Sequence, residues 1–203
     1  MTALAGENIA FIGLGLMGRP MALNLEKAGA ILTVNTRNPE TLNAFDDLGV
    51  ATAPTPADAA ANADIVIICV ANTEALENVL LGEDGVIDGM EEGTIVVDMG
   101  TTAIDATRRF ADAVEEAGGH WIDAPVSGGT HGAENGTVTI MVGAEEEDFQ
   151  RVQRVFGVLG SRVTHVGEIG SGQIAKAANQ MIVGITIGAI AEAFSMADEA
   201  GVD

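Results

Sequence analysis

The sequence predicts an α/β fold in which a doubly wound, mostly parallel sheet carries helices on both faces. Three observations lead to this prediction: strand-like and helix-like segments alternate, the strongest strands are continuous apolar runs, and glycines follow the first strand directly. The runs DIVIICV at 64–70 and TIVVD at 94–98 are typical of strands buried on both faces of a parallel sheet.

The remaining elements follow in chain order. Strands are expected at 8–12, 31–35, 64–70, 94–98, 120–124, 137–142 and 162–166. Helices are expected from the glycines after residue 12 through Ala28, and at 39–48, 73–81, 102–117 and 145–158, with one long helix from about residue 172. Pro39 opens the second helix, where its missing N–H is tolerated.

Composition limits the partners and the compartment. With 30 acidic and 9 basic residues, the net charge of −21 repels the phosphates of nucleic acids and anionic membranes. No signal peptide is recognisable, and MIVGITIGAIA at 181–191 is too short for a bilayer, so we expect a cytoplasmic protein. Dispersed acids with only two lysines indicate a halophilic source, with an ordinary acidic protein as the alternative. The single Cys69 is expected to be a buried, inert thiol.

Gly13, Gly15 and Gly18 form the pattern G-x-G-x-x-G between the first strand and the first helix. In a Rossmann-type fold these glycines permit a tight turn, close approach of a pyrophosphate, and helix–strand packing. The N–H groups of Leu16 and Met17 would then point at the phosphates. A merely tight turn is the alternative, and dinucleotide binding is the reading we favour.

The end of the second strand bears on the choice of dinucleotide. Asn35, Thr36 and Arg37 stand where a carboxylate would otherwise bind the ribose of NAD. Arg37 can pair with a 2′-phosphate through its planar guanidinium, or it can be an ordinary solvated arginine. We therefore expect NADP in preference to NAD.

Four blocks of sequence resemble the β-hydroxyacid dehydrogenases of the 3-hydroxyisobutyrate dehydrogenase and tartronate semialdehyde reductase type. They are IGLGLMGRPMALNL at 12–25, VVDMGTT at 96–102, DAPVSGGTHGAENGTVTIMVGA at 123–144 and GSGQIAKAANQM at 170–181. The resemblance covers essentially the whole chain, with the blocks in the family's order and spacing.

The resemblance implies the residues of an active site. Lys176 would be the general acid/base, since an apolar cleft beside a cationic nicotinamide lowers the pKa of an ammonium. Asn179, on the same helix face, would orient the substrate oxygen, whereas Gln180 replaces an asparagine of many relatives and its role is less defined. A solvated lysine on a helix face is the alternative for Lys176.

The same resemblance places further contacts. Ser127, Gly128 and Gly129 form a turn after a strand that would hold the substrate carboxylate, although a plain Gly-Gly turn would also explain them. Thr101 would contact the nicotinamide or its ribose. Val70, Ala71 and Asn72, at the end of the strand 64–70, would lie beside the cofactor, with Ala71 departing from the family's usual proline.

Other features sort the possible chemistries. The histidines His120, His131 and His165 show no metal-ligand spacing, so no metal is expected. A 6-phosphogluconate dehydrogenase would have His-Asn in place of Asn179-Gln180, and imine reductases replace the lysine. A small carboxylated alcohol or aldehyde remains as substrate, and the sequence leaves open whether it is of the 3-hydroxyisobutyrate or the tartronate semialdehyde type.

The final helix is apolar nearly all round and therefore needs to be covered by protein, with Gly184 and Gly188 permitting close approach of another helix. By resemblance, residues 1–170 form the NAD(P)-binding domain, and 171–203 begin the helix leading into an all-helical C-terminal domain that is absent here. That domain supplies much of the family's dimer interface, so a homodimer or larger homo-oligomer is expected. The chain would be an artificially shortened piece, a fragment or a naturally short form.

Two hypotheses about function stay open. The first is a dehydrogenase whose site is completed by the missing domain or by a partner. The second is an inactive NADP-binding module that retains an unused lysine, and only turnover separates the two.

Overall fold

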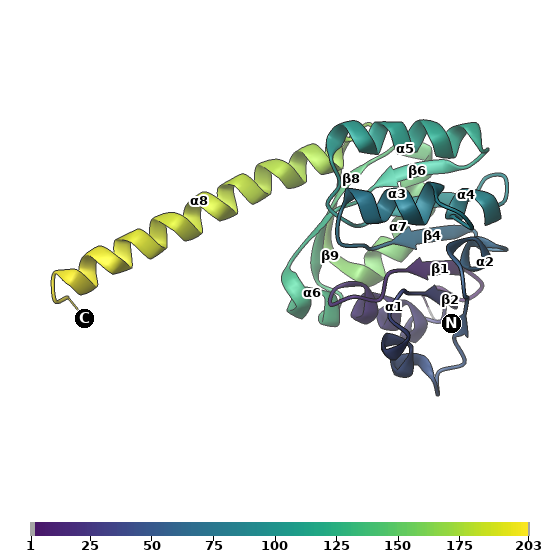
Figure 1. The fold of residues 1–203 in the computed structure, drawn as a ribbon, viewed down its shortest axis with the longest axis horizontal. Coiled ribbons are helices and arrows are strands. Elements are labelled where there is room, and N and C mark those ends of the chain that lie inside the picture. Colours follow the sequence, from purple (N-terminus) through teal and green to yellow (C-terminus); the bar gives the residue numbers. More distant parts are fainter. Residues whose placement is uncertain (1–2, 203) are drawn as a thin grey trace.

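The computed structural model describes residues 3–202, which form a twisted sheet flanked by helices and one long helix that leaves this body (Figure 1). Within these residues nine strands make one sheet, in the order β3-β2-β1-β4-β5-β6-β8-β7, with β9 paired to β8. The strands are β1 (Asn8–Ile12), β2 (Ile31–Asn35), β3 (Ala51–Thr52), β4 (Ile65–Ile68), β5 (Ile95–Asp98), β6 (His120–Asp123), β7 (Val126–Ser127), β8 (Val138–Gly143) and β9 (Gly160–Gly167).

The first six strands of the order are mutually parallel, whereas β8 runs antiparallel to both β6 and β7. From β1 the chain passes outward to β2 and β3, and then returns to β4 on the opposite side. The strand order therefore reverses between β1 and β4. In open α/β sheets, ligands bind beyond the carboxyl ends of the strands at such a point.

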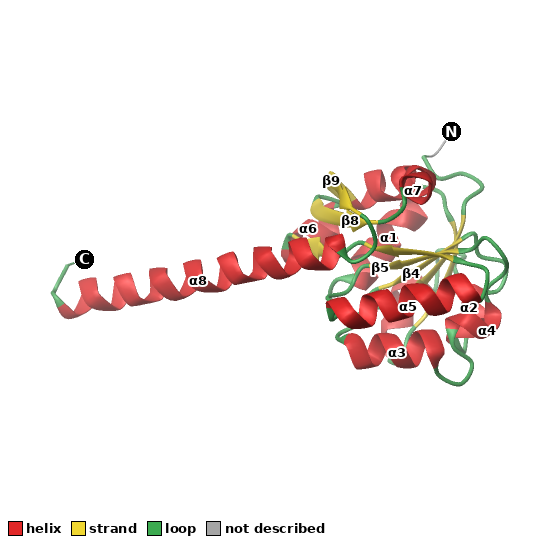
Figure 2. Ribbon diagram, turned by 90° about the horizontal axis from the view of Figure 1, so that it is seen from above, coloured by secondary structure: helices red, strands yellow, loops and turns green. Residues whose placement is uncertain are grey.

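Helices cover both faces of the sheet (Figure 2). They are α1 (Gly18–Lys27), the 3₁₀ helix η1 (Pro39–Phe45), α2 (Pro56–Ala60), α3 (Thr73–Leu81), α4 (Val86–Gly89), α5 (Ile104–Glu116), α6 (Gly129–Asn135), α7 (Glu146–Leu159) and α8 (Ser171–Glu199). Within β4, Ile65 and Ile67 pack in one apolar cluster with α1 and α7, and Val66 and Ile68 pack in a second cluster with α3 and α5. The doubly wound fold class is confirmed.

Several predicted boundaries need correction. The segment 39–48 forms a 3₁₀ helix that ends at Phe45, and the strand expected at 64–70 ends at Ile68. The strand expected at 162–166 extends over the whole of β9. The short elements β3, α2, α4, β7 and α6 were not expected, because segments of two to seven residues carry no apolar period of their own.

The long helix α8 is buried only at its start, where Gly172, Gln173 and Lys176 pack against the sheet. Farther along, Met181, Ile185 and Phe194 are 68%, 70% and 71% exposed. Figure 1 shows this part projecting from the body.

The apolar composition of α8 bears on the expected absence of a membrane segment. Among the described residues, α8 is the one helix long and apolar enough to cross a membrane, with a mean hydropathy of 1.5 over its most apolar window. The expectation of a segment too short for a bilayer considered only residues 181–191, and it is wrong for the whole helix. Length and composition are a weak indication, since a helix covered by protein has the same pattern.

Candidate cofactor and active site

The three glycines after β1 each meet a different steric demand. Gly13 has φ +98°, and a Cβ there would lie 2.4 Å from the carbonyl oxygen of Cys69. A Cβ on Gly18 would lie 1.9 Å from the carbonyl oxygen of Gly13, so α1 begins in direct contact with the loop. Gly15 has no atom within 4 Å of such a Cβ. The loop is therefore closed on the protein side and open at Gly15, which fits the approach of a pyrophosphate.

A cavity of about 480 Å³, here called the dinucleotide cavity, lies between this loop and the ends of β2 and β4. Of the predicted cofactor residues, it is lined by Gly13, Gly15, Asn35, Thr36, Arg37, Val70 and Ala71. Its size is within the range of small-molecule sites, and the open face at Gly15 gives a ligand access to backbone N–H groups. The residues present therefore fit a dinucleotide.

The predicted cofactor residues at the end of β2 make different contacts at the rim of this cavity. Asn35 is buried, and its amide donates to the carbonyl oxygen of Ala53 at 3.0 Å, so it holds the sheet edge. The hydroxyl of Thr36 accepts from the backbone N–H of Asn38 at 3.3 Å. Arg37 is exposed, and within residues 3–202 its guanidinium has no ion-pair partner. It is free to meet an anion at this rim.

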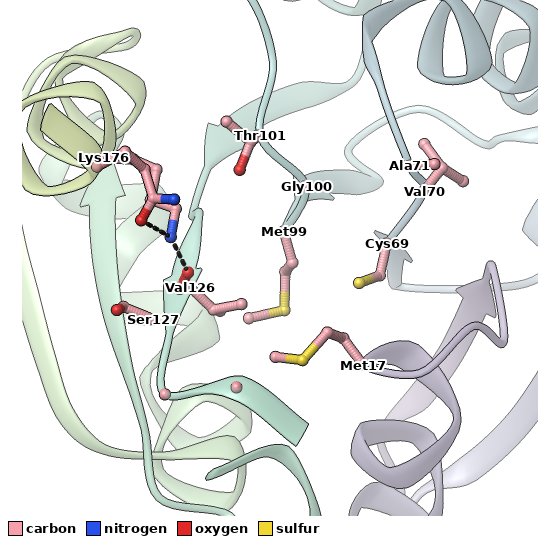
Figure 3. A pocket seen from close by; sticks show the side chains of 13 residues that line it. Met17, Cys69, Val70, Ala71, Met99, Gly100, Thr101, Val126, Ser127 and Lys176 are labelled. Atoms are coloured by element: carbon pink, nitrogen blue, oxygen red, sulfur yellow. Dashed lines mark hydrogen bonds between the residues drawn. The ribbon is translucent and has the colours of Figure 1, made fainter. Parts of the chain in front are cut away.

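A second cavity, of about 400 Å³ and here called the lysine cavity, is shown in Figure 3. It is lined by Met17, Cys69, Val70, Ala71, Met99, Gly100, Thr101, Val126, Ser127, Gly128, Gly129, Lys176 and Gln180. Cys69, Val70 and Ala71 line both cavities, so the two adjoin at the carboxyl end of β4. A dinucleotide held at the glycine loop would therefore extend toward Lys176.

Lys176 enters the lysine cavity from the second turn of α8 (Figure 3). Its Nζ atom donates to the carbonyl oxygen of Val126 at 2.8 Å and to Oε1 of Gln180 at 3.0 Å. The residue is 8% exposed, and no carboxylate among the described residues forms an ion pair with it. Desolvation lowers the pKa of Lys176, which suits an amine that exchanges a proton during a reaction.

The structure separates the two amides that follow Lys176 on α8. Gln180 lines the cavity, and its Oε1 also accepts from the side chain of Asn179 at 3.2 Å. Asn179 is not among the residues that line the cavity, and within residues 3–202 its hydrogen-bond link to Lys176 runs through Gln180. Gln180, whose role the resemblance left less defined, is therefore the amide that the structure places in the cavity, and the substrate-orienting role of Asn179 stays a prediction.

The segment Ser127–Gly129 is the junction between β7 and α6 rather than an isolated turn. Gly128 and Gly129 have φ values of +143° and +62°, which favour glycine. All three residues line the lysine cavity. Their backbone and the Ser127 hydroxyl are available to a polar group of the substrate.

Three comparisons with known proteins agree with this geometry. Residues 8–167 match the family described as the NAD binding domain of 6-phosphogluconate dehydrogenase, and residues 170–203 match the family described as NAD-binding of NADP-dependent 3-hydroxyisobutyrate dehydrogenase. The chain belongs to the β-hydroxyacid dehydrogenase family. The dinucleotide expectation is thereby confirmed for NAD(P), while the preference for NADP stays a prediction.

Curated relatives of the chain include a bacterial and a mammalian enzyme. The chain is 44% identical to the 2-hydroxy-3-oxopropionate reductase of Escherichia coli (strain K12), covering 96% of this chain and 66% of that protein. It is 36% identical to the mitochondrial 3-hydroxyisobutyrate dehydrogenase of Rattus norvegicus, covering 96% of this chain and 58% of that protein. The chain thus spans less than two thirds of the length of both relatives.

Solved structures with the same fold superpose closely on the chain. The 3-hydroxyisobutyrate dehydrogenase of Mycobacterium tuberculosis with L-serine has a TM-score of 0.90 at 33% identity, over 97% of this chain and 67% of that one. Psf3 in complex with NADP+ and 2-OPP has a TM-score of 0.89 at 28% identity, over 96% of this chain and 69% of that one. An imine reductase from Pseudomonas sp. shares the fold at 22% identity.

Three predicted cofactor residues of this family member lie outside both cavity linings. Leu16 is 79% exposed beside the glycine loop, and Gly18 is used in helix packing. Asn72 caps α3, where its Oδ1 accepts from the backbone N–H of Ala75 at 2.8 Å. Met17 lines the lysine cavity together with Thr101, and the expectation that its N–H faces the phosphates stays a prediction.

Cys69 was expected to be a buried, inert thiol, and the structure corrects the extent of this burial. The residue is half-buried and lies where the two cavities meet. Desolvation, with a smaller contribution from Asp98, raises the pKa of its thiol to about 12. The thiol therefore stays protonated, which agrees with the expected lack of reactivity.

Two buried aspartates, Asp98 and Asp123, were not singled out from the sequence alone. Asp98, at the end of β5, accepts from the N–H of Gly100 at 2.8 Å and from the Thr102 hydroxyl at 2.6 Å. Burial raises its pKa to about 6, and these hydrogen bonds oppose the rise. Asp123 lies at the end of β6. Burial raises its pKa, and hydrogen bonds from backbone N–H groups oppose this rise. A carboxylate closing an otherwise apolar strand was the available signal.

Proposed function

We propose that the chain is the cofactor-binding part of an NADP-dependent 3-hydroxyacid dehydrogenase in which Lys176 is the general acid/base. The observation that carries the proposal is the position of the Lys176 amine in a cavity that adjoins the dinucleotide cavity through Cys69, Val70 and Ala71. A proton-exchanging group is thus within reach of the end of a bound dinucleotide.

Converting an alcohol to a carbonyl removes a hydride and a proton. The nicotinamide, when bound, supplies the hydride chemistry. The neutral amine of Lys176 takes the hydroxyl proton in oxidation, and its ammonium returns that proton in reduction. The acceptors Val126 and Gln180 hold the Nζ atom in place in either direction.

The relatives and the cavity wall support a proposal for the substrate class. Relatives are named 2-hydroxy-3-oxopropionate reductase and 3-hydroxyisobutyrate dehydrogenase, whose substrates are small carboxylated alcohols or aldehydes. Ser127, Gly128 and Gly129 offer a hydroxyl and backbone groups for the carboxylate, and Gln180 offers an amide for the reacting oxygen.

Turnover is the decisive test. NADPH oxidation is followed with tartronate semialdehyde and with methylmalonate semialdehyde in concentrated salt, and NADPH binding is followed separately by fluorescence. We expect Lys176→Met to abolish turnover and to spare binding, and Lys27→Met, which changes the only other lysine, to alter neither. An unchanged rate in Lys176→Met would refute the catalytic role. Binding without turnover in the wild type would instead support an inactive NADP-binding module.

We further propose that α8 is covered by protein, in a homodimer or larger homo-oligomer. Its exposed apolar side chains and the open space around Gly184 and Gly188 support packing by another helix. Light scattering without detergent measures the molar mass. A monomer, or a chain that dissolves only with detergent, would contradict the proposal.

A further inference from the structure

We infer that Gln173 is a positioning residue. It holds the turn Gly100–Thr102, on one side of the lysine cavity, in a fixed position relative to α8, the helix that carries Lys176. This inference rests on the proposed function for its catalytic consequence. Its structural basis is a set of hydrogen bonds that joins two segments far apart in the sequence.

The side chain of Gln173 spans the whole turn after β5. Its Oε1 accepts from the backbone N–H of Thr102 at 3.1 Å, and its Nε2 donates to the carbonyl oxygen of Gly100 at 3.1 Å. Nε2 also donates to Oδ2 of Asp98 at 3.2 Å. Gln173 is 2% exposed, so no solvent competes for these groups. Thr101, between Gly100 and Thr102, is therefore held from both sides.

These partners permit only one orientation of the amide. A backbone N–H can only donate and a carbonyl oxygen can only accept, so Oε1 must face Thr102 and Nε2 must face Gly100. A flipped amide would lose both contacts. The site therefore selects for a side chain with an acceptor and a donor at fixed places.

The start of α8 cannot slide relative to the sheet. The backbone N–H of Gln173 donates to Asp123 at 2.8 Å, and that of Gly170 donates to the same carboxylate at 2.6 Å. A Cβ on Gly172 would lie 2.5 Å from the carbonyl oxygen of Met141, so only glycine allows this close packing. Lys176 follows Gln173 by three residues on the same buried face. Gln173 thus connects the turn to a helix start that is itself fixed.

The catalytic consequence is geometric. Hydride transfer needs the nicotinamide side of the cavity and the proton donor at a constant separation, and a displacement of about 1 Å can cost on the order of 10²-fold in rate. The dinucleotide cavity shares no lining residue with the Gln173 contacts. Loss of these contacts should lower kcat by a larger factor than it weakens NADPH binding, because the dinucleotide cavity keeps its own lining residues.

Two substitutions separate positioning from simple stability. Gln173→Met keeps the shape of the side chain and removes every hydrogen bond of the amide. Gln173→Glu keeps an acceptor for Thr102 but presents a second acceptor to Gly100 and Asp98 when ionised. A protonated glutamic acid restores a donor at that place. Asp98 and Asp123 hydrogen-bond to Gln173, Lys176 follows it one turn along α8, and Arg108 lies beside Gly170 at the start of the helix. The two buried aspartates favour the protonated acid.

The test measures reduction of the semialdehyde by NADPH, relative to wild type, as pH is lowered from neutral, at temperatures well below unfolding. We expect kcat to fall on the order of 10²-fold in both variants at neutral pH. The ratio of the kcat of Gln173→Glu to that of the wild type should recover as pH falls, whereas the same ratio for Gln173→Met should stay low. Gln173→Glu alone keeps the inference testable if Gln173→Met does not fold.

A second readout does not depend on turnover. Fluorescence of bound NADPH reports the surroundings of the nicotinamide, and trace acetylation compares the reactivity of Lys176 with that of Lys27 in the same molecule. We expect both to change in Gln173→Met, and to return toward wild type at low pH in Gln173→Glu. If the wild type binds NADPH without turnover, the proposed function fails but these readouts still decide the role of Gln173. Wild-type values of both readouts in both variants, with only a lower melting temperature, would overturn the inference.

Discussion

Lys176 donates a 3.0 Å hydrogen bond to Gln180, one helical turn farther along α8, and this contact holds the amine inside the cavity. The partner is a neutral amide, so it orients the ammonium without adding a countercharge. Desolvation lowers the pKa of Lys176, and a charged side chain at position 180 should therefore change this pKa.

Replacing Gln180 by glutamate should raise the pKa of Lys176, because a carboxylate at this distance stabilises the ammonium. Oxidation requires the neutral amine, so the acid limb of its pH profile should move to higher pH by about one unit. The measurement is kcat/KM for hydroxyacid oxidation as a function of pH. Gln180→Met is the matched control, since it adds no charge, and a limb that stays in place or moves to lower pH contradicts the prediction.

Alanine at Gly13 and at Gly15 should have opposite consequences. At Gly13 both the positive φ and the close Cys69 carbonyl oppose a Cβ, so we expect a loss of several kcal/mol of stability. At Gly15 nothing opposes the Cβ within the protein, so Gly15→Ala should fold normally and lose affinity for NADPH. Urea unfolding and NADPH titration measure the two effects. Equal stability losses in both variants would show that the loop is not open at Gly15.

Arg37 should determine the preference for NADP. Arg37→Ala should weaken NADPH binding about tenfold, which corresponds to about 1.4 kcal/mol for a charge-assisted contact, and leave NADH binding unchanged. Arg162→Ala, which removes an exposed arginine on β9, controls for the change in net charge. Parallel losses for both cofactors, or for both variants, would remove Arg37 from cofactor selection.

The buried Asp98 should make the free energy of unfolding depend on pH. Its pKa rises from 3.8 to about 6 on folding, so between these values the folded protein binds more protons than the unfolded chain. The stabilising contribution is complete below 3.8 and is lost as pH rises to about 6, with a size of about 3 kcal/mol. Urea unfolding across this range should show Asp98→Asn gaining on wild type as pH rises. Parallel curves for the two proteins would contradict the raised pKa.

The net charge of −21 should make stability depend on salt. We propose that the protein is adapted to a salt-rich cytoplasm. We expect its melting temperature to rise steeply with KCl concentration, because added salt screens the repulsion between its acidic side chains. The screening length falls from about 10 Å at 0.1 M to about 3 Å at 1 M. Sucrose at matched osmolality is the control for solvent exclusion. Equal effects of sucrose and KCl, or no effect of KCl, would favour an ordinary acidic protein.

Local patterns were sufficient for the sheet and the glycine loop. Apolar runs such as Ile65–Ile68 are buried on both faces in any parallel sheet, and the demands at Gly13 and Gly18 arise within one βα turn. The resemblance to the family added Lys176 and the Ser127–Gly129 segment, and both line the cavity. These features depend on residues close together in the chain, so the sequence alone could predict them.

The tertiary structure decided the contacts that join distant segments. Whether Asn179 or Gln180 faces the cavity depends on how α8 is rotated where Gly172 meets β6 and β8. The hydrogen bonds from Gln173 to Gly100 and Thr102 join residues that are more than seventy positions apart. The position of Cys69 between the two cavities depends on where β4 ends. No local period encodes such contacts, because they exist only after the ends of β4, β5 and β6 and the start of α8 have been brought together by the fold.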